Sequence, residues 1–181
     1  MAIDKKQLKT AKNYSEALFQ IGSAQNDIEK LYSQLKNITE ILNGSSELKT
    51  FLESPLVSAN DKKEIIYKVF GKDFDLQLIN LMNLLADNKR FALLETVLYC
   101  FEKLYEQKNN ISKVSVISAT EMNENSKKRL EAILNQKTGK NIIPQYRIKE
   151  DIIGGIIIKI NDKIIDLSLD KKIKNMERQL I

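Results

Sequence analysis

The chain has 181 residues, of which 43% are hydrophobic and 29% charged, as expected for an ordinary globular protein of one or two domains. It has no histidine and one cysteine, Cys100. These counts exclude an internal disulfide and remove both the usual general base near neutral pH and the commonest zinc ligand. No phosphate-binding glycine motif or paired-cysteine motif occurs, so we expect no catalytic residue, no metal site and no cofactor.

The charge is unevenly distributed along the chain. The formal net charge is +5, and basic and acidic residues balance through Asn110, so the whole excess lies after that residue. A basic surface there indicates an acidic partner, an anionic membrane face or nucleic acid. No stretch approaches the roughly 18 apolar residues needed to span a bilayer. The first ten residues predict no targeting segment.

Apolar residues recur at helical spacing through about residue 108 and predict a bundle of six helices. The first helix contains Ala11, Tyr14, Leu18 and Ile21, and we expect it to stop at Gly22. The others are expected over residues 28–42, 48–54, 58–70, 74–86 and 91–105. The second carries a seam that we assign to the bundle core, made of Ile28, Leu31, Leu35, Ile38 and Leu42. In the sixth helix we expect Cys100 to act as a small buried hydrophobic residue.

The fifth helix differs from the others because its apolar residues cover nearly the whole circumference: Leu76, Leu78, Ile79, Leu81, Met82, Leu84 and Leu85. A helix that is apolar all round must be covered all round. Two interpretations remain open. Either this is the central core helix of the bundle, or one side faces the core while the other forms the floor of a groove for an amphipathic helix of another protein.

A different pattern begins after Lys108-Asn109-Asn110, which we interpret as the joint between two domains. Residues 113–118 alternate and predict a strand, and residues 123–137 predict a helix that stops at Thr138-Gly139. Residues 142–148 predict a second strand, in which Pro144 indicates an edge position.

The stretch from residue 152 to 169 predicts a β-hairpin, because its dense isoleucines favour strands and Asn161-Asp162 can turn the chain. The loop length stays open. A three-residue loop sets Ile158, Ile160 and Ile164 on one face, which is the cleaner pattern, and a two-residue loop is the alternative. The Gly154-Gly155 pair predicts a bulge or sharp bend at the strand entry, since a phosphate cradle would need a helix directly after it.

A terminal helix should follow the hairpin, because four apolar residues fall on one helical face: Leu169, Ile173, Met176 and Leu180. Asp166 or Ser168 is expected to cap its first turn by accepting a hydrogen bond from a free backbone amide. Hairpin, cap and terminal helix together form a compact signature.

This signature resembles the C-terminal signature of the delta subunit family of F-type ATP synthase, the family of the oligomycin-sensitivity-conferring protein. The matching residues are Gly154, Gly155, Asp162, Asp166 and Ser168, whereas Leu167 stands where the family has glycine. Three earlier segments resemble family motifs in the same order: Tyr14-Ser15-Glu16-Ala17-Leu18-Phe19, Phe51-Leu52-Glu53-Ser54-Pro55 and Leu84-Leu85-Ala86-Asp87-Asn88-Lys89-Arg90. The matches therefore span nearly the whole chain.

The resemblance implies a mainly α protein, with a six-helix bundle over residues 1–108 and a small α+β domain over residues 109–181. It implies that the bundle binds the N-terminal helix of an ATP synthase α subunit in a groove between its first and fifth helices. The candidate contacts are Tyr14, Ala17, Leu18, Leu81 and Leu84. It also implies that the second domain binds the far ends of the b subunits of the peripheral stalk.

With these partners the chain would be a non-catalytic stator subunit that couples proton-driven rotation to ATP synthesis. The resemblance places it on the cytoplasmic face of the bacterial plasma membrane, as a peripheral protein that associates with the membrane only through the complex.

Two other classes fit the sequence less well. A basic nucleic-acid-binding adaptor would use the charge excess after Asn110, but Tyr146 is the only aromatic residue there, arginines are few, and no RNA or DNA motif occurs. We therefore expect no nucleic acid among the partners. An enzyme would need a lysine or carboxylate site, and no cluster of such residues stands out.

Overall fold

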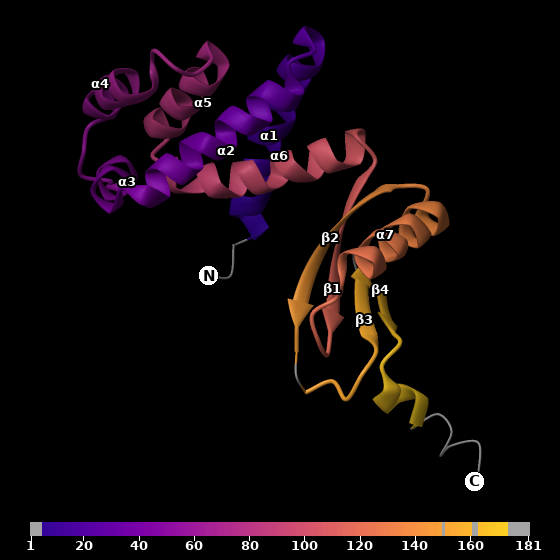
Figure 1. The fold of residues 1–181 in the computed structure, drawn as a ribbon. Coiled ribbons are helices and arrows are strands. Elements are labelled where there is room, and N and C mark those ends of the chain that lie inside the picture. The colour runs from indigo at the N-terminus through magenta and orange to yellow at the C-terminus, as the bar shows by residue number, and fades with distance from the viewer. Residues whose placement is uncertain (1–4, 150, 161–162, 174–181) are drawn as a thin grey trace. The chain divides into compact units, whose positions relative to one another are not determined.

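The computed structural model describes residues 5–149, 151–160 and 163–173. Contacts within the chain divide it into two compact units, residues 1–105 and 106–181, which we describe separately as unit 1 and unit 2 (Figure 1). The predicted fold class is confirmed: unit 1 is helical, and the sheet lies in unit 2.

Unit 1 is built from helices alone. Six α-helices and one 3-10 turn follow one another: α1 (Lys5–Gln25), α2 (Ile28–Gly44), α3 (Ser46–Glu53), α4 (Ala59–Phe70), α5 (Leu76–Asp87), η1 (Phe91–Leu93) and α6 (Leu94–Lys108). Serine side chains cap the N-termini of two of these helices. The Ser45 hydroxyl accepts a hydrogen bond from the Leu48 amide in α3, and the Ser58 hydroxyl accepts one from the Asp61 amide in α4. These caps satisfy amides that have no partner within the helix.

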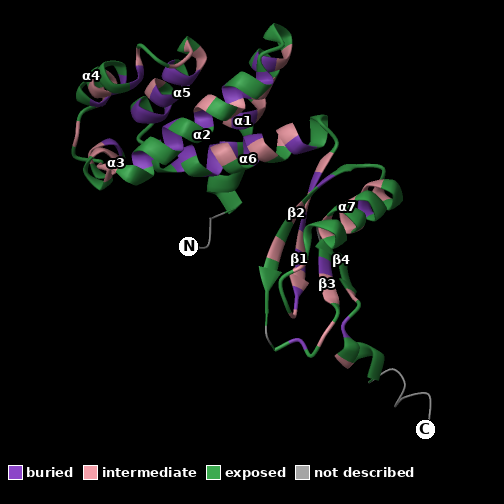
Figure 2. Cartoon of the chain, viewed as in Figure 1, coloured by how far each residue is buried: buried purple, intermediate pink, exposed green. Residues whose placement is uncertain are grey.

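The core of unit 1 gathers the apolar faces of all six helices, shown as purple ribbon in Figure 2. The predicted seam of α2 is entirely buried, and Phe70, Phe101 and Leu52 have no exposed surface. Cys100 is 9% exposed and belongs to this core, as expected. Burial raises the pKa of its thiol, because the charged thiolate is poorly solvated there.

The expectation that α1 stops at Gly22 is wrong, since the helix continues to Gln25. Gly22 is buried inside the helix, where a Cβ would lie 2.8 Å from Leu31 Cδ1 and 3.2 Å from Ile28 Cγ1. The glycine therefore lets α1 and α2 approach closely, which is a packing role and not a terminating one.

The described part of unit 2 contains a four-stranded sheet, the helix α7 and a short helical segment after the last strand. Its elements are β1 (Ile111–Ser118), α7 (Glu124–Thr138), β2 (Asn141–Ile148), β3 (Ile156–Ile160) and β4 (Lys163–Asp166). The strand order is β2-β1-β3-β4, and β2 runs parallel to β1 through the α7 crossover. The strand that carries Pro144 is at the edge, as predicted. Val114, Val116, Ile142 and Ile158 pack with Leu134 of α7 to form the core of this unit.

The β3–β4 register settles the loop length. Ile160 pairs with Lys163, and Ile158 pairs with Ile165, so two residues connect the strands. The three-residue interpretation is therefore wrong, and Ile164 lies on the face opposite to Ile158 and Ile160. Apolar residues on both faces of β4 made the pattern ambiguous, because either loop length places an isoleucine on the core side. Asp162 lies outside the described residues.

The glycine pair forms the predicted bend at the entrance to β3. Gly155 has φ +87°, and a Cβ there would collide with the carbonyl oxygen of Leu167. The Gly154 carbonyl accepts a hydrogen bond of 2.9 Å from the Leu169 amide. The glycines thus allow this bend to lie directly against the segment that leaves β4.

The predicted cap is confirmed in detail. The Ser168 hydroxyl accepts a hydrogen bond from the Lys171 amide, and the Asp166 carboxylate accepts one of 3.0 Å from the Ser168 amide. Residues 169–173 are helical. The remaining predicted positions of this helix, Met176 and Leu180, lie outside the described residues.

We predict that Gly155→Ala destabilises unit 2 more than the matched variant Gly139→Ala. Gly139, which ends α7, has φ +65° and open space around it, so alanine there costs only the left-handed backbone, about 1–2 kcal/mol. At Gly155 the collision with backbone is added. Urea denaturation of both variants measures the difference, and equal losses would contradict the proposed close approach.

Candidate partner-binding surfaces

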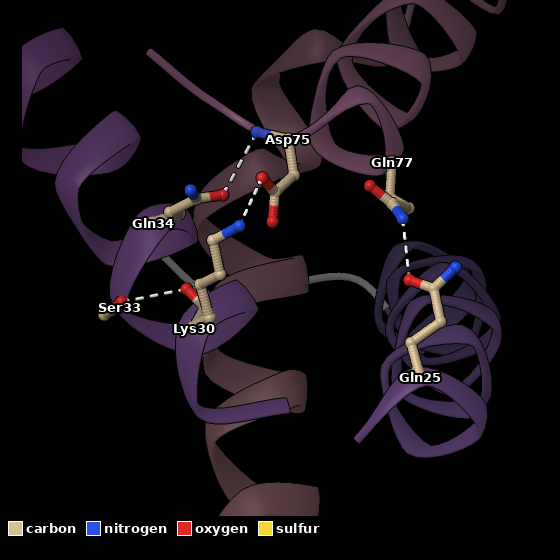
Figure 3. A network of polar contacts seen from close by, with 6 residues as sticks. All are labelled: Gln25, Lys30, Ser33, Gln34, Asp75 and Gln77. Carbon is tan, nitrogen blue, oxygen red and sulfur yellow. Dashed lines mark hydrogen bonds and ion pairs between the residues drawn. The ribbon is translucent and has the colours of Figure 1, made fainter. Parts of the chain in front are cut away.

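The N-terminal end of α5 is fixed by polar contacts to α1 and α2 (Figure 3). The Lys30 ammonium donates to the Asp75 carboxylate at 2.8 Å, and the Asp75 amide donates to the Gln34 side-chain oxygen at 3.2 Å. The hydrogen bond to Asp75 raises the pKa of Lys30. Gln77 donates to Gln25 of α1 at 2.7 Å. The start of α5 therefore lies beside the end of α1.

The opposite end of α5 lies beside the start of α1. A pocket of about 330 Å³ is lined there by residues from both regions: Lys6, Gln7, Thr10, Lys89, Arg90, Ala92 and Leu93. Contacts at both ends show that α1 and α5 are antiparallel neighbours. Ala17 is eight residues before Gln25, and Leu84 is seven residues after Gln77, so these two residues are nearly level along the helix pair.

The five residues predicted to contact a partner differ in exposure. Ala17 is exposed, Leu84 is 46% exposed and Tyr14 is half-buried against the core. Leu18 and Leu81 are buried at 4% and 7% exposure. The structure thus brings three of the predicted residues to the surface of the α1–α5 pair and places the other two in the core beneath it.

Each of the two interpretations of α5 agrees with part of what the structure shows. Leu78, Met82 and Leu85 have no exposed surface, as expected for a core helix. Leu76 and Leu84 remain 69% and 46% exposed, so the outer side is not covered within the described residues. Leu84 therefore leaves apolar surface beside α1 that is available to another protein.

We predict that Leu84→Ala and Leu85→Ala, adjacent leucines of the same helix, differ strongly in stability. Leu85→Ala leaves a cavity in the core and should cost about 2–5 kcal/mol, whereas Leu84→Ala should cost under about 1 kcal/mol. Urea denaturation of the two variants measures both values. A large loss at Leu84 would mean that this side chain serves the fold.

In the part of unit 2 that the structure describes, a second apolar surface is uncovered, the sheet face opposite α7. Strand register places Ile143, Ile117, Ile157 and Ile164 on this face. Ile143 and Ile164 are 46% and 62% exposed. Arg147 and Lys159 lie among them, and no described residue forms an ion pair with either. We name this the open sheet face.

Sequence reasoning missed the open sheet face and the basic residues at the end of the α1–α5 pair. In the sequence, Lys89 and Arg90 stand out only as part of a motif. Ile143 and Arg147 alternate in β2, but alternation alone does not say which face a single helix covers. The order β2-β1-β3-β4 was needed to assemble four separate segments into one surface.

The described residues contain no group of three or more cysteine or acidic side chains that could hold a metal ion. Within the same part of the chain, no helix combines the length and the hydropathy needed to cross a membrane.

The chain thus belongs to the class of proteins in which a helical bundle carries an appended α+β unit. Each of the two units has exposed apolar side chains of a kind suited to binding other proteins. A model of the family "ATP synthase delta (OSCP) subunit" matches residues 10–180. The chain belongs to this ATP synthase delta (OSCP) subunit family.

Individual relatives agree with the family assignment. ATP synthase subunit delta of Chlorobaculum tepidum is 33% identical over 171 residues, covering 94% of both chains. The sodium-ion-specific subunit delta of Ilyobacter tartaricus is 35% identical, covering 92% of this chain and 95% of its own. A chain in the structure of the Toxoplasma gondii mitochondrial ATP synthase hexamer shares the fold, with a TM-score of 0.68 and 22% identity over 94% of this chain and 96% of that one.

Proposed function

We propose that this protein is a non-catalytic stator subunit of F-type ATP synthase that links the catalytic head to the peripheral stalk. Unit 1 binds the N-terminal helix of an α subunit, and unit 2 binds the far ends of the b subunits. The link resists torque, so that rotation driven by proton flow is coupled to ATP synthesis. Family membership supports the complex, and the uncovered apolar surface on each unit supports two separate attachments.

The observation that carries the head attachment is the exposure of Leu84 on α5, level with exposed Ala17 on α1. The small Ala17 side chain allows a helix to approach closely, and half-buried Tyr14 offers a flat apolar ring with a polar tip. Leu18 and Leu81 support this surface from below. The bound segment is then an amphipathic helix with an apolar stripe along α1 and α5.

Alanine at Tyr14 or Leu84, or arginine at Ala17, should weaken binding of a peptide from the N-terminus of an α subunit by about 1–3 kcal/mol. The loss should appear mainly as faster dissociation, since interface variants change the off-rate more than the on-rate. Calorimetry and surface plasmon resonance with the full-length protein measure both effects.

The matched control is Leu56→Ala. Leu56 lies between α3 and α4 and is 94% exposed, so this variant removes an equally apolar surface side chain outside the α1–α5 pair. It should bind the peptide normally. Unchanged binding in the Tyr14, Ala17 and Leu84 variants would exclude this surface as the head attachment.

The stalk attachment rests on the open sheet face. Exposed Ile143 and Ile164 offer an apolar strip, and Arg147 and Lys159 add positive charge. Asp166 shares this face, but its carboxylate accepts a hydrogen bond from the Ser168 amide. This chemistry suits an amphipathic helix with acidic residues beside its apolar stripe. It also agrees with the position of the charge excess after Asn110.

Reversing one charge on the open sheet face, by Lys159→Glu, should weaken binding of a peptide from the far end of a b subunit and reduce the salt dependence of that binding. Lys128→Glu is the charge-matched control, because Lys128 is an exposed residue of α7 on the other side of the sheet. Sedimentation at several salt concentrations measures the change. Equal effects of the two variants would point to net charge alone and reject this face.

We further propose that the protein lies at the cytoplasmic face of the bacterial plasma membrane and is held there only through the complex. Proteins recovered with it from membranes should include the α, β and b subunits. Recovery of nucleic acid in their place would favour a nucleic-acid-binding adaptor.

A further inference from the structure

A cavity in unit 2 lies on the sheet face that carries α7. It has a volume of about 460 Å³, within the range of ligand-binding pockets. Its lining comes from four elements and one loop: Ser112, Lys137, Thr138, Lys140, Ile160, Lys163 and Ile165. α7 packs on β2 at one side of the sheet, and the described residues leave the β3–β4 side of this face uncovered.

Strand register explains how these residues meet. Ile160 pairs with Val114 of the core and with Lys163, so the Lys163 side chain shares the core face. Ile165 pairs with buried Ile158 and lies on that face too. Ser112 is two residues before Val114 and therefore projects in the same direction. The end of α7 adds Lys137 and Thr138.

Ser112 is the unusual member of this lining. It is only 4% exposed, and its hydroxyl has no hydrogen-bond partner among the described residues. The neighbouring Thr138 hydroxyl, by contrast, donates to the Leu134 carbonyl at 2.7 Å. A buried hydroxyl without a partner is disfavoured, so Ser112 offers a donor that a ligand oxygen can satisfy.

The charged residues among the described lining of the cavity all have the same sign. Lys137, Lys140 and Lys163 are exposed, and none of them forms an ion pair with any described residue. No carboxylate is among the described residues that line the cavity. Three ammonium groups and a free hydroxyl donor favour an anion, while Ile160 and Ile165 favour an apolar group directly beside it.

We propose that this cavity binds the terminal carboxylate of a polypeptide whose last residue is apolar. A C-terminal residue presents a carboxylate and an alkyl side chain from a single Cα, which matches donors placed beside two isoleucines. An internal aspartate or glutamate has no apolar group of its own. A long acyl chain would need more apolar lining than Ile160 and Ile165 provide.

This inference rests on the proposed function, which brings the far ends of the b subunits to unit 2. β4 is an edge strand of the sheet, with Ile164 on the open sheet face and Lys163 and Ile165 on the cavity face. A stalk chain that lies on the open sheet face can therefore turn around this edge and end in the cavity.

The test compares two synthetic peptides that hold about the last 15 residues of a b subunit, one with a free carboxylate and one with a terminal amide. Calorimetry with the full-length protein should show about tenfold weaker binding of the amide, because it loses the charge that the lysines recognise. The double variant Lys140→Gln, Lys163→Gln should abolish this preference. Lys128→Gln, which removes a charge elsewhere on α7, should keep it.

The variant Ser112→Ala distinguishes an effect on peptide binding from an effect on folding stability. Because the hydroxyl has no partner in the free protein, the variant should unfold at an unchanged or higher temperature, yet bind the free-acid peptide several-fold more weakly. Equal binding of acid and amide peptides would overturn the carboxylate site and leave the stalk attachment intact. Binding of neither peptide would overturn both. Competition by decanoate at the peptide's own affinity would identify a lipid anion site and also overturn the proposal.

Discussion

The burial of α5 is the constraint on which unit 1 depends. Leu78, Met82 and Leu85 are fully enclosed, and Asp75 ties the start of the helix to α2. A helix fixed in this way cannot turn to hide its outer side, so Leu84 stays at the surface beside α1. Core packing thereby presents the apolar surface that the proposed head attachment uses, already in place before a partner binds.

In unit 2 a sheet likewise leaves apolar side chains at the surface. One helix crosses from β1 to β2 and packs on one side of one face, which is too little to cover four strands. Among the described residues, the open sheet face and the β3–β4 side of the other face therefore remain uncovered. Both meet at β4, an edge strand, whose successive isoleucines point to opposite sides. Under the proposed function, this exposed edge strand is where another chain attaches.

Much of this fold could be predicted from the sequence, because the strongest signals are local. Helical spacing indicated the seam of α2, Pro144 indicated the edge strand, and Ser168 indicated the cap. The failures have a common cause. Gly22 looked like a helix stop because the side chains of Leu31 and Ile28 that crowd it come from another helix. The loop after β3 was ambiguous because β4 is apolar on both faces. At the candidate surface, two family motifs pointed to Ala17 and Leu84. Only tertiary packing separates these exposed residues from buried Leu18 and Leu81.

Two separate attachments have a physical advantage for a protein that must resist torque. If one end dissociates, the other keeps it close to its site, so that rebinding is an intramolecular event at high effective concentration. The protein is then held in the complex more tightly than either surface would hold it alone. The division into two units, each with its own core, allows this because strain at one attachment need not disturb packing in the other. Under the proposed function, moderate affinity at Leu84 and at the open sheet face is therefore sufficient. By the same proposal, a chain with no metal-binding cluster in its described residues controls whether ion flow yields ATP.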